Sequence, residues 1–157
     1  MRPTSPRLLR FALNWWSPFR GAGIRVRHVA ADLRSVTVEM RLRAFIRTSA
    51  GAHFGGSLYA MTDPFFALMV QANLGSDYLV WDKAGSIDYV APGRGRVWAR
   101  LELAVADLEC IVRMTASGDK HLHLFKADIK DADGMVVARV EKMVYVRRTR
   151  SAPRGPP

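Results

Sequence analysis

The chain has 157 residues, of which 49% are hydrophobic and 24% are charged, with a formal net charge of +10. This composition excludes a disordered chain, and no apolar run approaches the roughly 20 residues that a membrane-spanning helix needs. The excess basic charge lies at the two ends, in residues 1–27 and 147–157, while the span between them is balanced, which argues against a nucleic-acid-binding core.

The first predicted element is a short amphipathic helix at about residues 4–16. The Ser17-Pro18 pair is expected to end it, because proline disfavours helical geometry in the residue before it. Gly21 and Gly23 then indicate a loop. One side of this helix is apolar and contains Leu8, Leu9, Ala12, Leu13 and Trp16.

From Ile24 onward apolar and polar residues alternate, which is typical of strands with one buried face. The alternation predicts a hairpin with Asp32 near its turn, and an Asp133-Gly134 turn before the last strand. Lys142 interrupts the apolar face of that last strand. The predicted strands cover about residues 24–29, 36–42, 78–90, 97–105, 121–130 and 136–146, with Pro92, Gly93 and Gly95 in the turn between the third and fourth.

Residues 56–74 interrupt this β pattern, being too long for a strand and apolar on nearly every side. Such a helix must be wrapped by other structure. The fold class is therefore α+β: a curled antiparallel sheet of about six strands around one long central helix, with a short N-terminal helix. We expect a single domain over residues 1–148, followed by a basic Pro/Arg-rich tail over residues 149–157.

Chemistry-bearing residues gather at the start of the central helix. Gly55 and Gly56 leave backbone N–H groups that a carbonyl oxygen or an anion can approach. Asp63 interrupts the apolar helix eight residues after Gly55, and function often explains a carboxylate in such a place. The alternative is structural, because an aspartate followed by Pro64 is also a good cap for a helix that starts at residue 64.

The histidines and a basic turn have two interpretations each. His53 stands beside the glycine pair, where it is either an acid-base group or a structural loop residue. His121 and His123 share one face of a strand, but no carboxylate or cysteine has a supporting spacing, so we expect no metal site. Residues 93–96 read Gly-Arg-Gly-Arg, which suits either phosphate binding or an exposed hairpin turn.

Cys110, the only cysteine, cannot form an intramolecular disulfide, which indicates a reducing, cytoplasmic location.

The segment HFGGSLYAMTDPFF, residues 53–66, resembles the helix-opening motif of hot-dog fold acyl-CoA thioesterases. Its glycine pair places Asp63 at the position of the catalytic acid in the phenylacetyl-CoA type. The chain is still more similar to an uncharacterised, thioesterase-like domain family of the same fold. That similarity covers about residues 8–148 and includes NWWSPFRGAGI, DYLVWDKAGSIDYVAPGRG and VEKMVYVRR.

Two positions depart from the thioesterase motif. Phe54 stands directly before the glycine pair, where the motif has histidine, and His53 is displaced by one residue. The preceding loop, residues 47–50, has no asparagine, for which Thr48 or Ser49 would substitute in part.

The resemblance implies hydrolysis of an acyl-CoA or similar thioester, with no further cofactor. The amides of Gly55 or Gly56 would polarise the thioester carbonyl, and His53 would assist. Asp63 would activate a water or, as the alternative, act as the nucleophile. Hot-dog sites form between subunits, so the resemblance implies a homodimer or a dimer of dimers. The residues expected to bind substrate are Phe54, Tyr59, Phe65, Phe66 and Met69 for the acyl group, and Arg94 and Arg96 for the CoA phosphates.

Two other functions remain open from the sequence. The first is a non-catalytic hot-dog module that binds an acyl or acyl-CoA ligand. The second is a protein whose basic ends bind nucleic acid or a membrane surface, although we expect no nucleic acid as partner and no membrane span.

Overall fold

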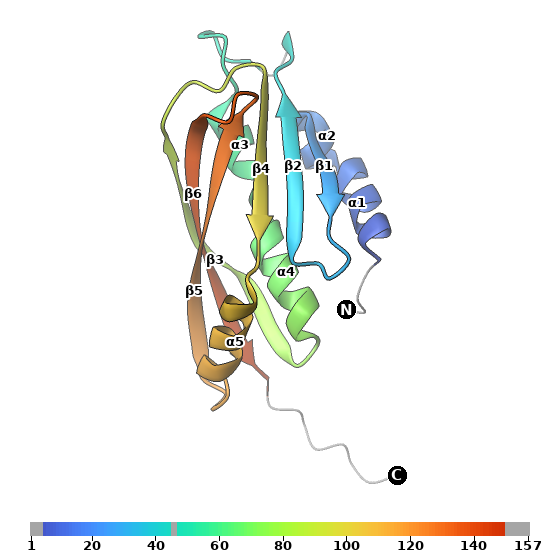
Figure 1. Ribbon diagram of the computed structural model, residues 1–157, viewed down its shortest axis with the longest axis vertical. Helices are drawn as coiled ribbons and strands as arrows, with labels where there is room; N and C mark the ends of the chain where they lie inside the picture. The colour runs from blue at the N-terminus through green and yellow to red at the C-terminus, as the bar shows by residue number, and fades with distance from the viewer. Residues whose placement is uncertain (1–4, 45–46, 150–157) are drawn as a thin grey trace.

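One antiparallel sheet curls along a central helix in the computed structural model, which describes residues 5–44 and 47–149 (Figure 1). The six strands are ordered β1-β2-β4-β5-β6-β3. The α+β class and the curled sheet predicted from the sequence are confirmed. The strands are β1 (Ile24–Val29), β2 (Ser35–Arg41), β3 (Tyr78–Tyr89), β4 (Arg96–Glu102), β5 (Lys120–Asp131) and β6 (Val136–Arg148).

The alternating residues of the strands build the hydrophobic core. Val38 of β2 lies opposite Ala99 of β4, and both are buried on the face that meets the helix. The predicted turn between β5 and β6 is also confirmed, because the Asp131 amide donates to the Met135 carbonyl at 2.9 Å and Gly134 has a φ of 85°. Period-two patterning therefore places these strands correctly.

The central helix has two segments, α3 (Gly55–Ala60) and α4 (Phe65–Leu74). Residues 61–64 between them form turns, in which the Asp63 amide donates to the Ala60 carbonyl at 3.3 Å. Pro64 has no N–H to continue the helical ladder, which accounts for the break. The predicted helix over residues 56–74 is thus present, interrupted at Pro64.

The N-terminal region departs from the prediction in two ways. A first helix, α1 (Pro6–Trp15), is followed at once by a second, α2 (Ser17–Ala22), where a loop was predicted. Pro18 lies in the first turn of α2, where its missing N–H costs nothing, and Gly23 ends the helix in the left-handed region at φ 73°. Of the predicted apolar side of α1, Leu9 is buried, whereas Leu8 and Trp16 are exposed.

A fifth helix, α5 (Val105–Met114), follows β4 and was not predicted. The expected strand 97–105 ends at Glu102, and Val105 is the first helical residue. Leu108 and Ile111, spaced by three residues, pack on the core. The apolar alternation of β4 continues through Leu103 to Val105 by coincidence, which hid the start of the helix.

The two edge strands of the sheet differ, because β1 is covered by a helix and β3 is open. At β1, the side chain of Asn14 from α1 bonds both backbone groups of Val26, at 2.8 and 3.0 Å, so that helix covers this edge (Figure 1). At the other edge, β3 pairs in the described part of the chain only with β6, and Leu79 and Trp81 are exposed. An open, partly apolar edge favours pairing with another chain.

The ends of the chain bear on two predictions. Thr149, the first residue of the predicted tail, donates from its amide and its hydroxyl to the Asp77 carbonyl, both at 2.8 Å. This residue therefore belongs to the folded domain. The remainder of the tail, residues 150–157, and residue 4 of the predicted N-terminal helix lie outside the described residues.

Candidate active site

The glycine pair opens α3 at the edge of a surface groove of about 550 Å³. Residues 52–56 and Leu58 form one wall, and residues 89–93 form the other. The first amides bonded inside this helix are those of Ser57 and Leu58, which both donate to the Phe54 carbonyl. The amides of Gly55 and Gly56 precede them, so the predicted backbone donors lie at the groove.

Aromatic side chains approach both glycines closely. A Cβ on Gly55 would lie 2.8 Å from the hydroxyl of Tyr89, and one on Gly56 would lie 2.5 Å from the ring of Phe54. Both aromatic residues are exposed, Phe54 by 60% and Tyr89 by 52%. Tyr89 is thus a groove residue that the sequence did not single out, and its only signal was its place at the end of a predicted strand.

His53 is buried and holds the far wall of the groove in place. Its amide donates to the Gly93 carbonyl at 2.9 Å, and its Nε2 lies 3.0 Å from the Gly95 carbonyl. A carbonyl only accepts, so Nε2 carries the proton. Burial lowers the pKa of His53 below its usual 6.5, although the bond to Gly95 opposes the shift. The ring is therefore neutral near pH 7, and these contacts favour its structural interpretation.

Thr48, expected to substitute for the missing asparagine, is engaged within its own loop. Its hydroxyl donates to the Ala52 carbonyl at 3.2 Å, and its amide donates to the same carbonyl at 2.8 Å. These bonds close the turn that leads into His53. The hydroxyl is therefore a loop-closing group here.

Asp63 does not cap α4. Pro64 occupies the capping position of that helix, and no side chain bonds its first amides. Instead, Oδ1 of Asp63 accepts a hydrogen bond of 2.6 Å from Nζ of Lys142 on β6. The side chain of Asp63 remains 48% exposed, so a water can still reach its carboxylate.

Lys142 is the buried partner of Asp63, and no role at the site was predicted for it. It is 1% exposed, and its ammonium group also donates to the hydroxyl of Tyr59 at 3.2 Å and lies 3.7 Å from Oδ2 of Asp82. We call Tyr59, Asp63, Asp82 and Lys142 the carboxylate cluster. The signal in the sequence was a lysine in an otherwise apolar position of the last strand, and a buried ammonium group requires such partners.

Burial and charge shape the ionisation of the cluster. Burial alone would lower the pKa of Lys142, but the bonds to Asp63 and Tyr59 and the charge of Asp82 outweigh it and raise that pKa above 10.5. Burial also raises the pKa of Asp82 above 3.8, against the opposing charge of Lys142. Lys142 is thus a fixed cation at neutral pH, shared between two carboxyl groups.

Gly85 makes room for the cluster. It lies opposite Lys142 across the β3–β6 ladder, where a Cβ would come within 2.0 Å of the Tyr59 hydroxyl and 3.0 Å of Lys142 Cδ. Any larger residue would therefore displace the tyrosine from the ammonium group. A bulge between Asp82 and Ala84 shifts the register of β3 just before this glycine.

The residues expected to bind the acyl chain have different surroundings. Phe65, Phe66 and Met69 are fully buried in the core, where Phe66 stacks on Phe125 with ring centroids 4.6 Å apart. They do not line the groove, because the inner face of the sheet covers them. Phe54 does line the groove, and Tyr59 belongs to the carboxylate cluster.

Arg94 and Arg96, expected at the CoA phosphates, are exposed and follow the groove wall in the chain. Gly93, immediately before Arg94, lines the groove, whereas neither arginine does. The structure thus brings His53, Phe54, Gly55 and Gly56 together, and it keeps Asp63 out of the groove lining.

The surroundings of His121 and His123 differ from those expected. The sequence shows no cysteine or carboxylate at a supporting spacing from His121 and His123, yet α5 brings Cys110 close to both rings. Asp107 of the same helix lies 3.1 Å from Nε2 of His123. These partners were missed because they lie on the helix that was not predicted.

Comparisons with known proteins agree with this architecture. A probable thioesterase of unknown function from Pseudomonas aeruginosa, PA5026, is 15% identical with a TM-score of 0.80 over 94% of this chain and 98% of that one. The thioesterase HI1161 from Haemophilus influenzae is 15% identical with a TM-score of 0.66, covering 92% of both chains. A mutant of the phenylacetic acid degradation protein PaaI from Thermus thermophilus is 25% identical with a TM-score of 0.57, over 81% and 96%.

Two further findings complete the comparison. No curated protein matches the chain. Within residues 5–44 and 47–149, no helix combines the length and the apolar character needed to cross a membrane.

A family model covers nearly the whole domain. It matches residues 5–146, from the residue before α1 into β6, and so includes both the groove and the carboxylate cluster. The solved structures that resemble the chain share its sheet wrapped around a central helix. The protein therefore has a hot-dog fold and belongs to the family described as a domain of unknown function, DUF4442.

Proposed function

We propose that this protein hydrolyses thioesters of the acyl-CoA type at a site shared between two chains. The observation that carries the proposal is Asp63, a half-exposed carboxylate oriented by the buried Lys142 at 2.6 Å. Its position relative to the glycine pair matches the thioesterase motif in the sequence. The names of the solved thioesterases with this fold support the same reaction class.

Asp63 acts as the general base in this proposal. Lys142 contacts only Oδ1, so the second carboxylate oxygen serves to take a proton from water while the water attacks the thioester carbonyl. The attack forms a C–O bond, and collapse of the tetrahedral intermediate breaks the C–S bond and releases the thiol. Lys142 and Tyr59 orient the carboxylate without touching substrate.

The glycine pair supplies the complementary electrostatic part. Its amides, which precede the first bonded amides of α3, stabilise the negative charge that develops on the carbonyl oxygen, and removal of one such donor costs about 10²–10³-fold in turnover in other enzymes. Phe54 and Tyr89 provide apolar surface for the acyl group. Arg94 and Arg96, exposed next to the groove wall, are available to the CoA phosphates.

The separation of Asp63 from the glycine pair within one chain supports a site shared between two chains. Asp63 is not among the residues that line the groove of its own chain. The open edge of β3 offers a surface for pairing with a second copy, because its exposed Leu79 and Trp81 would be covered there. In a homodimer, Asp63 of one chain would face the glycine pair of the other.

A panel of acyl-CoA thioesters tests the reaction, with Asp63→Asn as the diagnostic variant. The amide oxygen can still accept from Lys142 but cannot take a proton, so turnover should fall about 10²–10⁴-fold while the fold is kept. Asp133→Asn, in the exposed turn before β6, is the matched control and should retain full activity. Equal turnover of the parent and Asp63→Asn would rule out the carboxylate as base.

Mixing two inactive variants tests the shared site. Asp63→Asn is combined with Gly56→Leu, which blocks the groove, and the mixture is allowed to exchange subunits. A shared site leaves one intact site in each mixed dimer, so activity should return to about a quarter of the parent value. A mixture that contains mixed dimers but stays inactive would place both parts of the site in one chain.

A further inference from the structure

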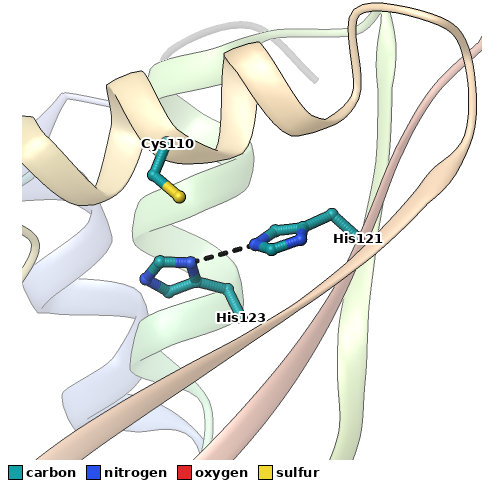
Figure 2. A group of neighbouring side chains, drawn as sticks. All are labelled: Cys110, His121 and His123. Atoms are coloured by element: carbon teal, nitrogen blue, oxygen red, sulfur yellow. Dashed lines mark hydrogen bonds between the residues drawn. The ribbon is translucent and has the colours of Figure 1, made fainter.

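A cysteine and two histidines converge where α5 lies beside the start of β5 (Figure 2). Cys110 points from the helix toward the strand, and His121 and His123 stand on alternate residues of β5 and so on one face of the sheet. One ligand atom from each of the three residues lies within 4.8 Å of the other two. All three are half-buried, which leaves a path for an ion from solvent.

The contact between Asp107 and His123 leaves Nδ1 of His123 without a proton. Oδ1 of Asp107 lies 3.1 Å from its Nε2, and because a carboxylate only accepts, that nitrogen carries the ring proton. The lone pair of Nδ1 then faces Nε2 of His121 at 3.2 Å. When His121 holds its proton on Nδ1, both facing nitrogens have a lone pair available to an ion.

The separations fit a tetrahedral zinc site. Two imidazole nitrogens bound to Zn²⁺ at 2.0–2.1 Å lie about 3.3 Å apart, close to the 3.2 Å found here. A zinc-bound thiolate lies about 3.6 Å from such nitrogens, so a modest rotation of the Cys110 side chain completes three ligands. Cysteine and histidine together are also the donor set that Zn²⁺ favours.

Asp107 gives the site the outer carboxylate that metal-binding histidines usually have. Its Oδ2 accepts a hydrogen bond of 3.1 Å from the Ala104 amide at the start of α5, while Oδ1 holds the His123 ring. The carboxylate thus fixes the ring in the orientation that ligation needs. This second-sphere contact is an observation independent of the three ligands.

We propose that Cys110, His121 and His123 bind one Zn²⁺ ion, with a water as the fourth ligand. Binding releases the thiol proton of Cys110 and leaves the imidazoles neutral. The ion would tie α5 to β5, in addition to the contact between Asp107 and His123. The site is separate from Asp63 and Lys142, and it stands whether or not the protein hydrolyses thioesters.

Co²⁺ binding tests the site directly. Cys110 is the only cysteine, so any thiolate band of bound Co²⁺ must come from it. Tag-free protein, stripped with a chelator, is titrated with Co²⁺ and then with Zn²⁺. We expect one equivalent of Co²⁺ to give the visible bands of a tetrahedral ion and a thiolate charge-transfer band, and Zn²⁺ to remove both. Zn²⁺ should also raise the melting temperature, since it binds the folded chain.

Variants distinguish specific Zn²⁺ binding by these residues from nonspecific binding elsewhere on the protein. Cys110→Ser should lose the charge-transfer band and the rise in melting temperature, and Asp107→Asn should weaken Zn²⁺ binding about 10–100-fold. His28→Ala, at an exposed position of β1, is the control and should bind as the parent does. Absence of a thiolate band in the parent, or equal Zn²⁺ binding by Cys110→Ser, would overturn the proposal.

Discussion

The glycine segment, residues 53–56, and the carboxylate cluster are joined by a single helical segment, α3, yet they are built in opposite ways. The Gly55-Gly56 pair within this segment depends on side chains that are absent, and the side chains closest to the pair, Phe54 and Tyr89, are exposed and able to move. The cluster depends on charged groups held in place, with Lys142 only 1% exposed. One region is open and adaptable, and the other is closed and constrained.

Because of this difference, we expect substitutions in the carboxylate cluster to change mainly stability and substitutions of the glycines to change mainly activity. A substitution in the cluster leaves a buried charge without its partner, which costs folding free energy. A substitution in the glycine segment meets a flexible aromatic side chain instead, so it should change access to the backbone amides and leave the fold nearly unaffected. The following variants test that division.

Lys142→Met should have the largest effect on stability. It leaves Asp63 and Asp82 without their cation, and we expect the free energy of unfolding to fall by about 2–3 kcal/mol, below the ~3–5 kcal/mol of a fully buried pair because Asp63 is half-exposed. Urea unfolding at neutral pH measures the loss. A variant as stable as the parent would mean that the cluster contributes nothing.

The pH dependence of the same variant adds a second measurement. The pKa of Asp82 is already raised by burial, and loss of the Lys142 charge raises it further. A carboxyl group with a raised pKa opposes folding at neutral pH, and that penalty is relieved as the pH falls through the pKa of the folded state. The stability gap between parent and variant should therefore narrow on acidification toward 3.8, and a constant gap would contradict this account.

Gly85→Ala should follow, with a loss of about 1–2 kcal/mol. The new methyl group takes the place of the Tyr59 hydroxyl, which must leave Lys142, while the ion pair with Asp63 is kept. Thermal unfolding measures the effect, with Gly21→Ala as control because a Cβ at Gly21 meets nothing within 4 Å. Equal melting temperatures for the two variants would show that Tyr59 has room to move.

His53→Gln should cost less than about 1 kcal/mol near neutral pH, because the amide nitrogen can still donate to the Gly95 carbonyl. The informative readout is the pH profile of stability. A lowered pKa means that the unfolded chain binds a proton first, so the parent loses stability as the pH falls from 6.5 to the pKa of folded His53. The variant should lack that loss, and an unchanged profile would assign the titration elsewhere.

Gly55→Ala should have the smallest effect on stability, within about 0.5 kcal/mol, because the exposed Tyr89 can turn away and alanine favours the helix. Its turnover of thioesters should nevertheless fall, since the methyl group stands beside the amides of the groove. Parallel measurement of melting temperature and turnover checks both points. A fall in both would mean that Tyr89 is held in place and that the groove is as constrained as the cluster.

The sequence was most informative where one local pattern decided the structure. The alternation in Val36, Val38 and Met40 placed β2, and the long apolar run before Gly75 placed the central helix. The same approach failed at α5, where a short helix begins directly after an alternating strand, and only packing of Leu108 and Ile111 on the core distinguishes the two. It also missed α2, because proline can begin a helix as well as end one.

In the candidate site, too, some features follow from a local sequence pattern and others only from tertiary packing. The sequence by itself determined the sheet, the central helix with its glycine opening, and the presence of Asp63 within that helix, because each depends on neighbours in the chain. Only the tertiary structure decided that Asp63 pairs with Lys142 rather than capping α4, and that Cys110 meets His121 and His123. Asp63 and Lys142 are 79 residues apart in the chain. A contact of that range is set by how the sheet curls over the helix, which no local pattern of residues encodes.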